Sequence, residues 1–133
     1  MHVRVFLARH AESVLNALGR VQGWADSPLT ERGRAEAQVL GRALRTAEAN
    51  LVAARCADMM RHRQTVEGAL AAAGSEVVPE PDPRLRELAF GRFEGAANAK
   101  LRRALAAYHG HSRPWACRDG RWRAGSATPR SPC

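Results

Sequence analysis

Alternation of apolar and polar residues predicts three short β-strands along the chain. The first is MHVRVFL (residues 1–7), where valine or leucine occupies every second position from the third onward. The runs LVAARC (51–56) and EVVP (76–79) are the other strand candidates. EPDP (80–83) is expected to be a loop, because proline lacks a backbone donor and restricts the residue before it.

Helical spacing of apolar residues predicts four helices between and after these strands. The longest starts at the candidate N-cap Thr30, and another starts at Asp58 and ends at Gly74, a residue type common just past helix C-termini. Two shorter helices are expected over residues 12–18 and 96–108. Strands that alternate with helices are typical of an α/β fold with a parallel sheet.

Length and composition fit one small domain. With 133 residues, 45% apolar but only 5% aromatic, the chain is expected to have a modest core of leucine, valine and alanine. No apolar run is long enough to cross a membrane, and charged residues interrupt the first apolar run, which argues against a signal peptide. Cys56, Cys117 and Cys133 lack metal-ligand spacing, which predicts a reducing, cytoplasmic location.

The net charge of +8 is concentrated at the C-terminal end. Residues 100–133 contain eight basic side chains and one acidic one, a net charge of +7, which leaves +1 for residues 1–99. From residue 109 onward the chain is rich in Arg, Gly, Pro and Ser and lacks apolar periodicity. We therefore expect a domain over residues 1–108 and a basic, disordered tail over 109–133, which binds polyanions weakly but no specific nucleic acid.

A candidate reactive group follows the first predicted strand. The segment Leu7–Ser13 places Arg9 and His10 where the strand ends and a helix begins. Backbone N–H groups, the helix dipole and a guanidinium all favour an anion at such a position. His10 is the group in this cluster able to act as a nucleophile near neutral pH, although a buried, hydrogen-bonded histidine beside a surface arginine also fits the pair.

Further motifs accompany this pair in a definite order. They are Arg9–Glu12 (RHAE), Asn16, Gly19–Gly23 (GRVQG), Asp26, Pro28–Thr30 (PLT), Gly33, Asp58–Arg61 (DMMR), Thr65, Leu85–Glu87 (LRE), Phe90–Gly91 and Glu94–Gly95. Over residues 3–95 the chain closely resembles the histidine phosphatase superfamily, the phosphoglycerate-mutase-like enzymes. The resemblance implies a three-layer α/β/α fold, here incomplete.

The same resemblance implies phosphomonoester hydrolysis through a phosphohistidine intermediate. His10 would be the nucleophile, and Arg9 and Arg61 would hold the phosphoryl oxygens by charge-assisted hydrogen bonds. Glu87 would protonate the leaving oxygen and then activate water. Arg61 and Glu87 also fit a solvated helix face and an ordinary surface acid, and His62 is expected to face solvent.

Asn16, Gln22 and Gly23 match positions that line the mouth of the family's substrate pocket. The implied partner is a small phosphorylated metabolite. Neither a metal nor an organic cofactor is implied, because the arginines supply the positive charge. Two alternatives stay open: a phosphoglycerate mutase, which returns the phosphoryl group to a second hydroxyl, and a catalytically inactive phosphate-binding remnant.

Three departures from the family pattern bear on activity. Ala11 stands where glycine is usual, and Ala57 stands where serine is common. The family also completes its pocket with a second histidine at the end of a later strand, whereas no apolar strand precedes the segment His109–His111. The C-terminal end therefore looks like a truncated or frame-shifted sequence, with impaired activity and a first strand whose unpaired edge favours self-association.

Overall fold

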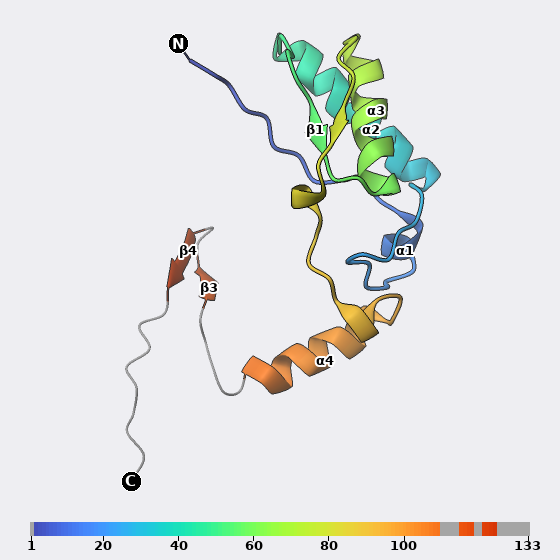
Figure 1. Cartoon of the computed structure of the whole chain (residues 1–133), viewed down its shortest axis with the longest axis vertical. Helices are drawn as coiled ribbons and strands as arrows, with labels where there is room; N and C mark the ends of the chain where they lie inside the picture. Colours follow the sequence, from blue (N-terminus) through green and yellow to red (C-terminus); the bar gives the residue numbers. More distant parts are fainter. Residues whose placement is uncertain (1, 110–114, 119–120, 125–133) are drawn as a thin grey trace. The chain divides into compact units, whose positions relative to one another are not determined.

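The computed structural model describes residues 2–109, 115–118 and 121–124, and the chain divides into two units, Met1–Asn98 and Ala99–Cys133 (Figure 1). The elements of the first unit are α1 (Val14–Ala17), α2 (Glu31–Thr46), β1 (Arg55–Cys56), α3 (Met60–Ala73), β2 (Glu80–Pro81) and the 3₁₀ turns η1 (Pro83–Leu85) and η2 (Gly91–Phe93). Helices alternate with short strands, so the predicted mixed α/β character is confirmed.

The two strands of this unit pair in parallel. Arg55 lies opposite Glu80, and Cys56 lies opposite Pro81. Of the strand expected over residues 51–56, only the last two residues form β1. The strand expected at 76–79 does not form. A strand lies instead at Glu80–Pro81, inside the segment 80–83 that was predicted to be a loop, so the predictions for 76–79 and for 80–83 are both wrong.

Pro81 fits into a strand because its neighbours supply the donors. The N–H of Glu80 donates to the carbonyl of Ala54 (2.9 Å), and the N–H of Asp82 donates to the carbonyl of Cys56 (2.7 Å). The position between them does not donate to β1, so a residue without an N–H costs no ladder hydrogen bond there.

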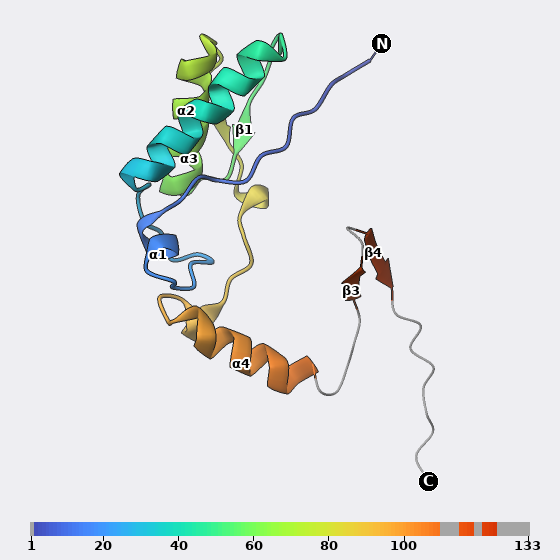
Figure 2. The same ribbon diagram turned by 180° about the vertical axis from the view of Figure 1, so that it is seen from behind.

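Helices α2 and α3 pack side by side, as the opposite views in Figures 1 and 2 show. Gly41 of α2 permits this close approach, because a Cβ there would overlap the carbonyl oxygen of Ala69 and lie 2.7 Å from the Cβ of Ala72. The buried apolar residues are small or aliphatic, as expected: Ala11, Val21, Leu29, Ala37, Cys56, Ala57, Ala69 and Leu70.

Two of the predicted helix ends are confirmed by the structure and one is not. The Thr30 hydroxyl accepts a hydrogen bond from the N–H of Gly33 (3.0 Å), and Gly74 ends α3 with a left-handed φ of 72°, so both predictions are confirmed. Asp58 does not cap α3. The N–H of Met60 donates instead to the carboxylate of Asp26, which comes from a different part of the chain.

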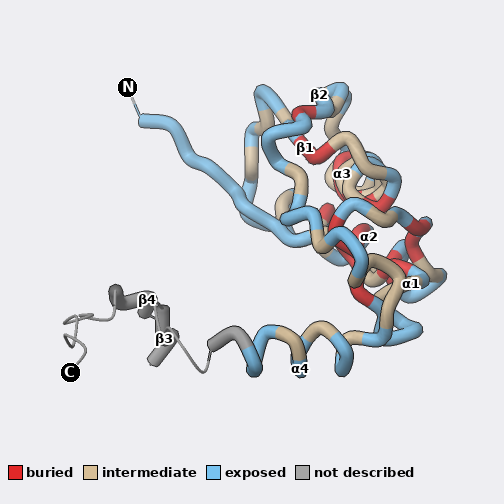
Figure 3. The backbone as a smooth tube through the Cα atoms, turned by 60° about the horizontal axis from the view of Figure 1, so that its bottom comes forward, coloured by how far each residue is buried: buried red, intermediate tan, exposed pale blue. Residues whose placement is uncertain are grey.

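The N-terminal segment is extended but is not a strand in the structure. Val3, Val5 and Leu7 are 76%, 80% and 98% exposed, and the segment is pale blue along its course in Figure 3. The guanidinium of Arg4 donates to the carbonyl of Ala47 (3.3 Å), but no strand among the described residues pairs with the backbone here. The prediction of a first strand is therefore wrong for this structure, because strand geometry needs a partner for its backbone groups.

Helix α4 (Asn98–His109) begins at the last residue of the first unit and continues into the second, which also contains β3 (Trp115–Arg118) and β4 (Arg121–Ala124). The helix confirms the one expected over residues 96–108. The two strands pair antiparallel, so these eight residues depart from the irregular structure expected for the tail. His109, the first residue of that predicted tail, is the last residue of α4, and the tail residues outside α4, β3 and β4, including His111, lie outside the described residues. No helix in the described ranges has the length and apolar character to cross a membrane.

The contact between α2 and α3 yields a test of the packing. In Gly41→Ala the added methyl group must displace the backbone of α3, so we expect a loss of about 1–3 kcal/mol in the free energy of unfolding. Alanine's higher helix propensity offsets only about 1 kcal/mol of that strain. Urea denaturation measures the change.

The matched control on the same helix is Val39→Ala, because Val39 is 56% exposed. We expect that variant to change stability by no more than about 0.5 kcal/mol. A Gly41→Ala variant as stable as the parent chain would contradict the close helix contact.

Candidate active site

His10 lies just before α1, half-buried, with its imidazole held by a local hydrogen bond. Its Nδ1 donates to the carbonyl of Ala11 (2.8 Å), so the neutral ring carries its proton on Nδ1 and leaves the lone pair of Nε2 free. The N–H of Ala11 donates to the hydroxyl of Thr65 (3.0 Å), which in turn donates to the carbonyl of Arg61 (2.6 Å). The segment that carries His10 is therefore tied to α3.

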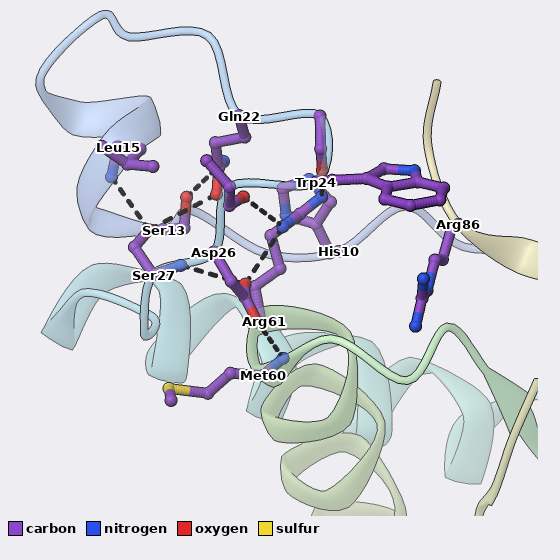
Figure 4. A network of polar contacts seen from close by, with 12 residues as sticks. His10, Ser13, Leu15, Gln22, Trp24, Asp26, Ser27, Met60, Arg61 and Arg86 are labelled. Atoms are coloured by element: carbon purple, nitrogen blue, oxygen red, sulfur yellow. Dashed lines mark hydrogen bonds and ion pairs between the residues drawn. The ribbon is translucent and has the colours of Figure 1, made fainter. Parts of the chain in front are cut away.

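Arg61 is buried at the start of α3, with only 1% of its side chain exposed. Its Nη1 donates to the carboxylate of Asp26 (3.0 Å) and to the carbonyl of Ala25 (3.2 Å), and its Nη2 donates to the carbonyl of Gly23 (2.8 Å) (Figure 4). Its Nε is buried and has no hydrogen-bond partner within the described part of the chain. The guanidinium thus fastens the loop over residues 23–26 to α3 with three of its five N–H groups.

Gly23 stands where that loop meets the segment after Glu87. Its φ is +54°, and a Cβ would lie 2.6 Å from Cδ2 of Phe90, 2.8 Å from the carbonyl oxygen of Leu88 and 2.9 Å from Oε1 of Glu94. Both the backbone conformation and the lack of space require glycine. Gly23 therefore permits the close approach of two segments that are far apart in the sequence.

Asn16 and Gln22 belong to a polar network centred on Ser13. Nε2 of Gln22 donates to the Ser13 hydroxyl (2.6 Å), and the Ser27 hydroxyl donates to Oε1 of Gln22 (3.4 Å). Oδ1 of Asn16 accepts from the Ser13 hydroxyl (3.0 Å) as part of the N-terminal cap of α1. Both amide side chains hold α1 and the loop in place, and direct contact with a substrate stays a prediction for them.

Arg9 and Glu87 are both exposed, and their opposite charges have opposite effects on His10. The positive charge of Arg9 lowers the pKa of His10, and the negative charge of Glu87 raises it. Oε1 of Glu87 accepts from the N–H of Leu88 (3.0 Å), and the carbonyl of Glu87 accepts from the indole N–H of Trp24 (3.0 Å). The carboxylate therefore affects His10 through its charge, while its Oε1 is hydrogen-bonded to the neighbouring backbone.

A second ion pair holds the segment that contains Glu87. The guanidinium of Arg86 donates to both oxygens of the Asp58 carboxylate, with Nε 2.6 Å from Oδ1. The same guanidinium lies 4.9 Å from the centre of the Trp24 ring, in cation–π geometry (Figure 4). Asp58, expected to cap a helix, instead anchors this segment beside the loop. The sequence holds no local signal for that pairing.

Two histidines meet in the site. The ring of His62 lies with its centre 5.0 Å from that of His10, at an interplanar angle of 71°. Burial lowers the pKa of His62 to about 4, with further contributions from Arg61 and His10. Burial also lowers the pKa of His10, and Arg61 and Arg9 add to that shift. The expectation that His62 faces solvent is wrong, because its ring is half-buried against His10.

These features describe a site suited to an anion and a neutral nucleophile. His10 presents a free ring nitrogen, and the surrounding side chains of Arg61 and Arg9 carry positive charge. Among the residues that the structure describes, no cluster of three or more His, Cys, Asp or Glu side chains could hold a metal ion.

Comparison with known proteins gives a consistent picture. A family model of the histidine phosphatase superfamily (branch 1) matches residues 5–127. A probable phosphoglycerate mutase of Erwinia tasmaniensis is 42% identical over 92 residues, which are 69% of this chain and 41% of that protein. A protein of the same name from Photorhabdus laumondii is 40% identical over the same shares. The chain thus spans 41% of the length of these curated relatives.

Solved structures are similar over comparable stretches. The phosphoglycerate mutase of Bacillus anthracis matches with a TM-score of 0.70 and 35% identity, covering 76% of this chain and 44% of that one. A mycobacterial glucosyl-3-phosphoglycerate phosphatase, solved in complex with VO3, matches with a TM-score of 0.62 and 26% identity, covering 71% of this chain and 44% of that one. The chain is therefore similar both to a protein named as a mutase and to one named as a phosphatase.

The lowered pKa of His62 predicts a pH dependence of stability. An unfolded histidine binds a proton near pH 6.5, whereas His62 in the folded chain does so only near pH 4. Between these values the unfolded state binds more protons, so stability is highest above pH 6.5 and falls as the pH drops toward 4. We expect His62→Ala to reduce the loss of stability between pH 7 and pH 5, measured by urea denaturation at each pH.

His2→Ala serves as the control, because His2 is exposed and the paired rings are those of His10 and His62. That variant should lose as much stability on acidification as the parent chain does. An unchanged pH dependence in His62→Ala would show that the ring is not buried as described.

Proposed function

Because the chain belongs to the histidine phosphatase superfamily, matching it over residues 5–127, we propose that it hydrolyses phosphate monoesters through a phosphohistidine formed at His10. The observation that carries the proposal is the state of that ring. Its Nδ1 is occupied by the carbonyl of Ala11, and burial together with nearby cations lowers its pKa. At neutral pH the ring is therefore unprotonated at Nε2, as a nucleophile must be.

In the first half-reaction, Nε2 of His10 attacks the phosphorus of the ester. The N–P bond forms while the P–O bond to the leaving group breaks, and Glu87 in its protonated form gives its proton to the leaving oxygen. In the second half-reaction, the Glu87 carboxylate takes a proton from a water molecule that attacks the same phosphorus. The N–P bond then breaks, inorganic phosphate leaves, and His10 returns to its neutral state.

Arg61 and Arg9 supply positive charge to the phosphoryl oxygens. Nη1 of Arg61 uses both of its N–H groups and Nη2 uses one on the loop over residues 23–26, so in the described part of the chain Nε–H and the second N–H of Nη2 are the donors left for a ligand. Arg9 is exposed and free to turn toward an anion. These charges support a mechanism that needs neither a metal nor an organic cofactor, since phosphoryl transfer depends mainly on positioning and charge.

The substrate class that fits this proposal is a small phosphorylated metabolite. We also propose a cytoplasmic location, as expected from the cysteines. Phosphoglycerate mutase activity is the second candidate, favoured by the names of the curated relatives. A mutase would return the phosphoryl group of His10 to a second hydroxyl instead of to water. A chain that binds phosphate without turnover is the third candidate.

Trapping the phosphoenzyme tests the proposal. With a ³²P-labelled phosphate donor, we expect the chain to form an acid-labile, base-stable phosphoryl adduct, as a phosphorus–nitrogen bond to imidazole requires. His10→Ala should abolish the adduct, while His2→Ala, a change of the same residue type outside the site, should leave it intact. Equal labelling of His10→Ala and the parent chain would overturn the assignment of the nucleophile.

The same preparation separates the candidate activities. A phosphatase releases inorganic phosphate from an aryl phosphate without any added primer. A mutase turns over only after priming by a bisphosphorylated sugar acid. Binding of inorganic phosphate without any labelling of the protein would support the inactive alternative and contradict the hydrolase.

A further inference from the structure

His62 is a polar side chain of the site for which the proposed reaction has no use. It follows Arg61 on α3, and its ring centre lies 5.0 Å from that of His10. Among the side chains that the structure describes, it is the one histidine that contacts His10. A second imidazole therefore lies within a few ångströms of the ring that would carry a phosphoryl group.

The surroundings of His62 determine which of its nitrogens carries the proton. Nδ1 is buried and has no hydrogen-bond partner in the described part of the chain. A proton on that nitrogen would be buried without an acceptor, which is costly, whereas an unpaired lone pair there is the smaller penalty. The neutral ring is therefore protonated at Nε2, on the side of a half-buried ring that is left to a ligand or solvent.

Two cations near the pair of rings favour an anion as that ligand. Arg61 acts on both histidines and Arg9 acts on His10, while the carboxylates of Glu87 and of Asp26, which is paired with Arg61, also act on His62. A neutral His62 adds no positive charge of its own to this set. A neutral imidazole can still donate one hydrogen bond to a phosphoryl oxygen, and it does so without competing for the proton that Glu87 transfers.

We propose that His62 binds the phosphoryl group held at His10, as a neutral hydrogen-bond donor through Nε2–H. This inference rests on the proposed function, since it assumes that His10 is where the phosphoryl group is attached. The second histidine implied by the family resemblance belongs to a later strand. His62 comes from a helix in the first half of the chain, so its assignment stands on the geometry of this site alone.

Binding of orthovanadate to the whole chain tests the proposal, measured by titration at neutral pH. We expect His62→Ala to weaken binding about 10- to 100-fold, the effect of losing one hydrogen bond to a charged group. The amide nitrogen of glutamine can occupy the place of Nε2, so His62→Gln should bind within a few-fold of the parent chain. The amide of asparagine reaches only the place of Nδ1, and His62→Asn should be as weak as His62→Ala.

His2→Ala is the matched control and should bind orthovanadate like the parent chain. Unchanged binding by His62→Ala would overturn the proposal, as would better recovery by asparagine than by glutamine. If His62→Ala fails to fold, the comparison of the glutamine and asparagine variants decides the question, because both keep a polar side chain at this position. A parent chain that does not bind orthovanadate contradicts the proposal outright.

The phosphoenzyme measurement distinguishes this failure from failure of the proposed function. Labelling at His10 together with vanadate binding that is indifferent to residue 62 rejects only the role of His62. Vanadate binding that depends on residue 62, without any labelling at His10, supports the donor role and rejects the hydrolytic mechanism.

Discussion

The arrangement of this site depends on the burial of one guanidinium. Removing a charged group from water is costly unless the protein replaces its hydrogen bonds. Arg61 meets that requirement with the carboxylate of Asp26 and the carbonyls of Gly23 and Ala25. Asp26 also accepts from the N–H of Met60, so one carboxylate both neutralises the buried charge and caps α3.

Several other features follow from that constraint. Because the loop over residues 23–26 is held against α3, the segment after Glu87 can approach it closely, and Gly23 is the residue that leaves room. The indole of Trp24 then reaches the carbonyl of Glu87 and stacks on Arg86. The hydrogen bonds from Ala11 through Thr65 to α3 bring His10 to the same place, beside a positive charge that favours its neutral form.

Local signals in the sequence predicted the helices well but not the strands, which depend on long-range contacts. Thr30 and Gly74 were predictable as helix ends because capping depends on residues within one turn. The first strand was predicted wrongly because a strand needs a partner strand, which local signals do not reveal. The cap at Asp58 was predicted wrongly because the Asp58 carboxylate binds Arg86 instead. The order of motifs predicted the family, and the matched region confirms it.

The roles of individual site residues are harder to predict than the site itself. His62 illustrates this, because a histidine between two arginines on a helix suggests a solvated face, and only the fold turns it toward His10. The inward direction of the Gln22 amide is a similar case, since its partners Ser13 and Ser27 lie on either side of it in sequence. Side-chain direction depends on the packed environment and not on sequence spacing alone.

A double-mutant cycle between Asp26 and Arg61 tests most directly whether their buried pair holds the site together. The free energy of unfolding is measured by urea denaturation for the parent chain, for Asp26→Ala, for Arg61→Met and for the double variant. A buried, hydrogen-bonded pair predicts that the double variant is less destabilised than the sum of the single ones, with a coupling of about 1–3 kcal/mol. Effects that add to within about 0.5 kcal/mol would contradict that central role.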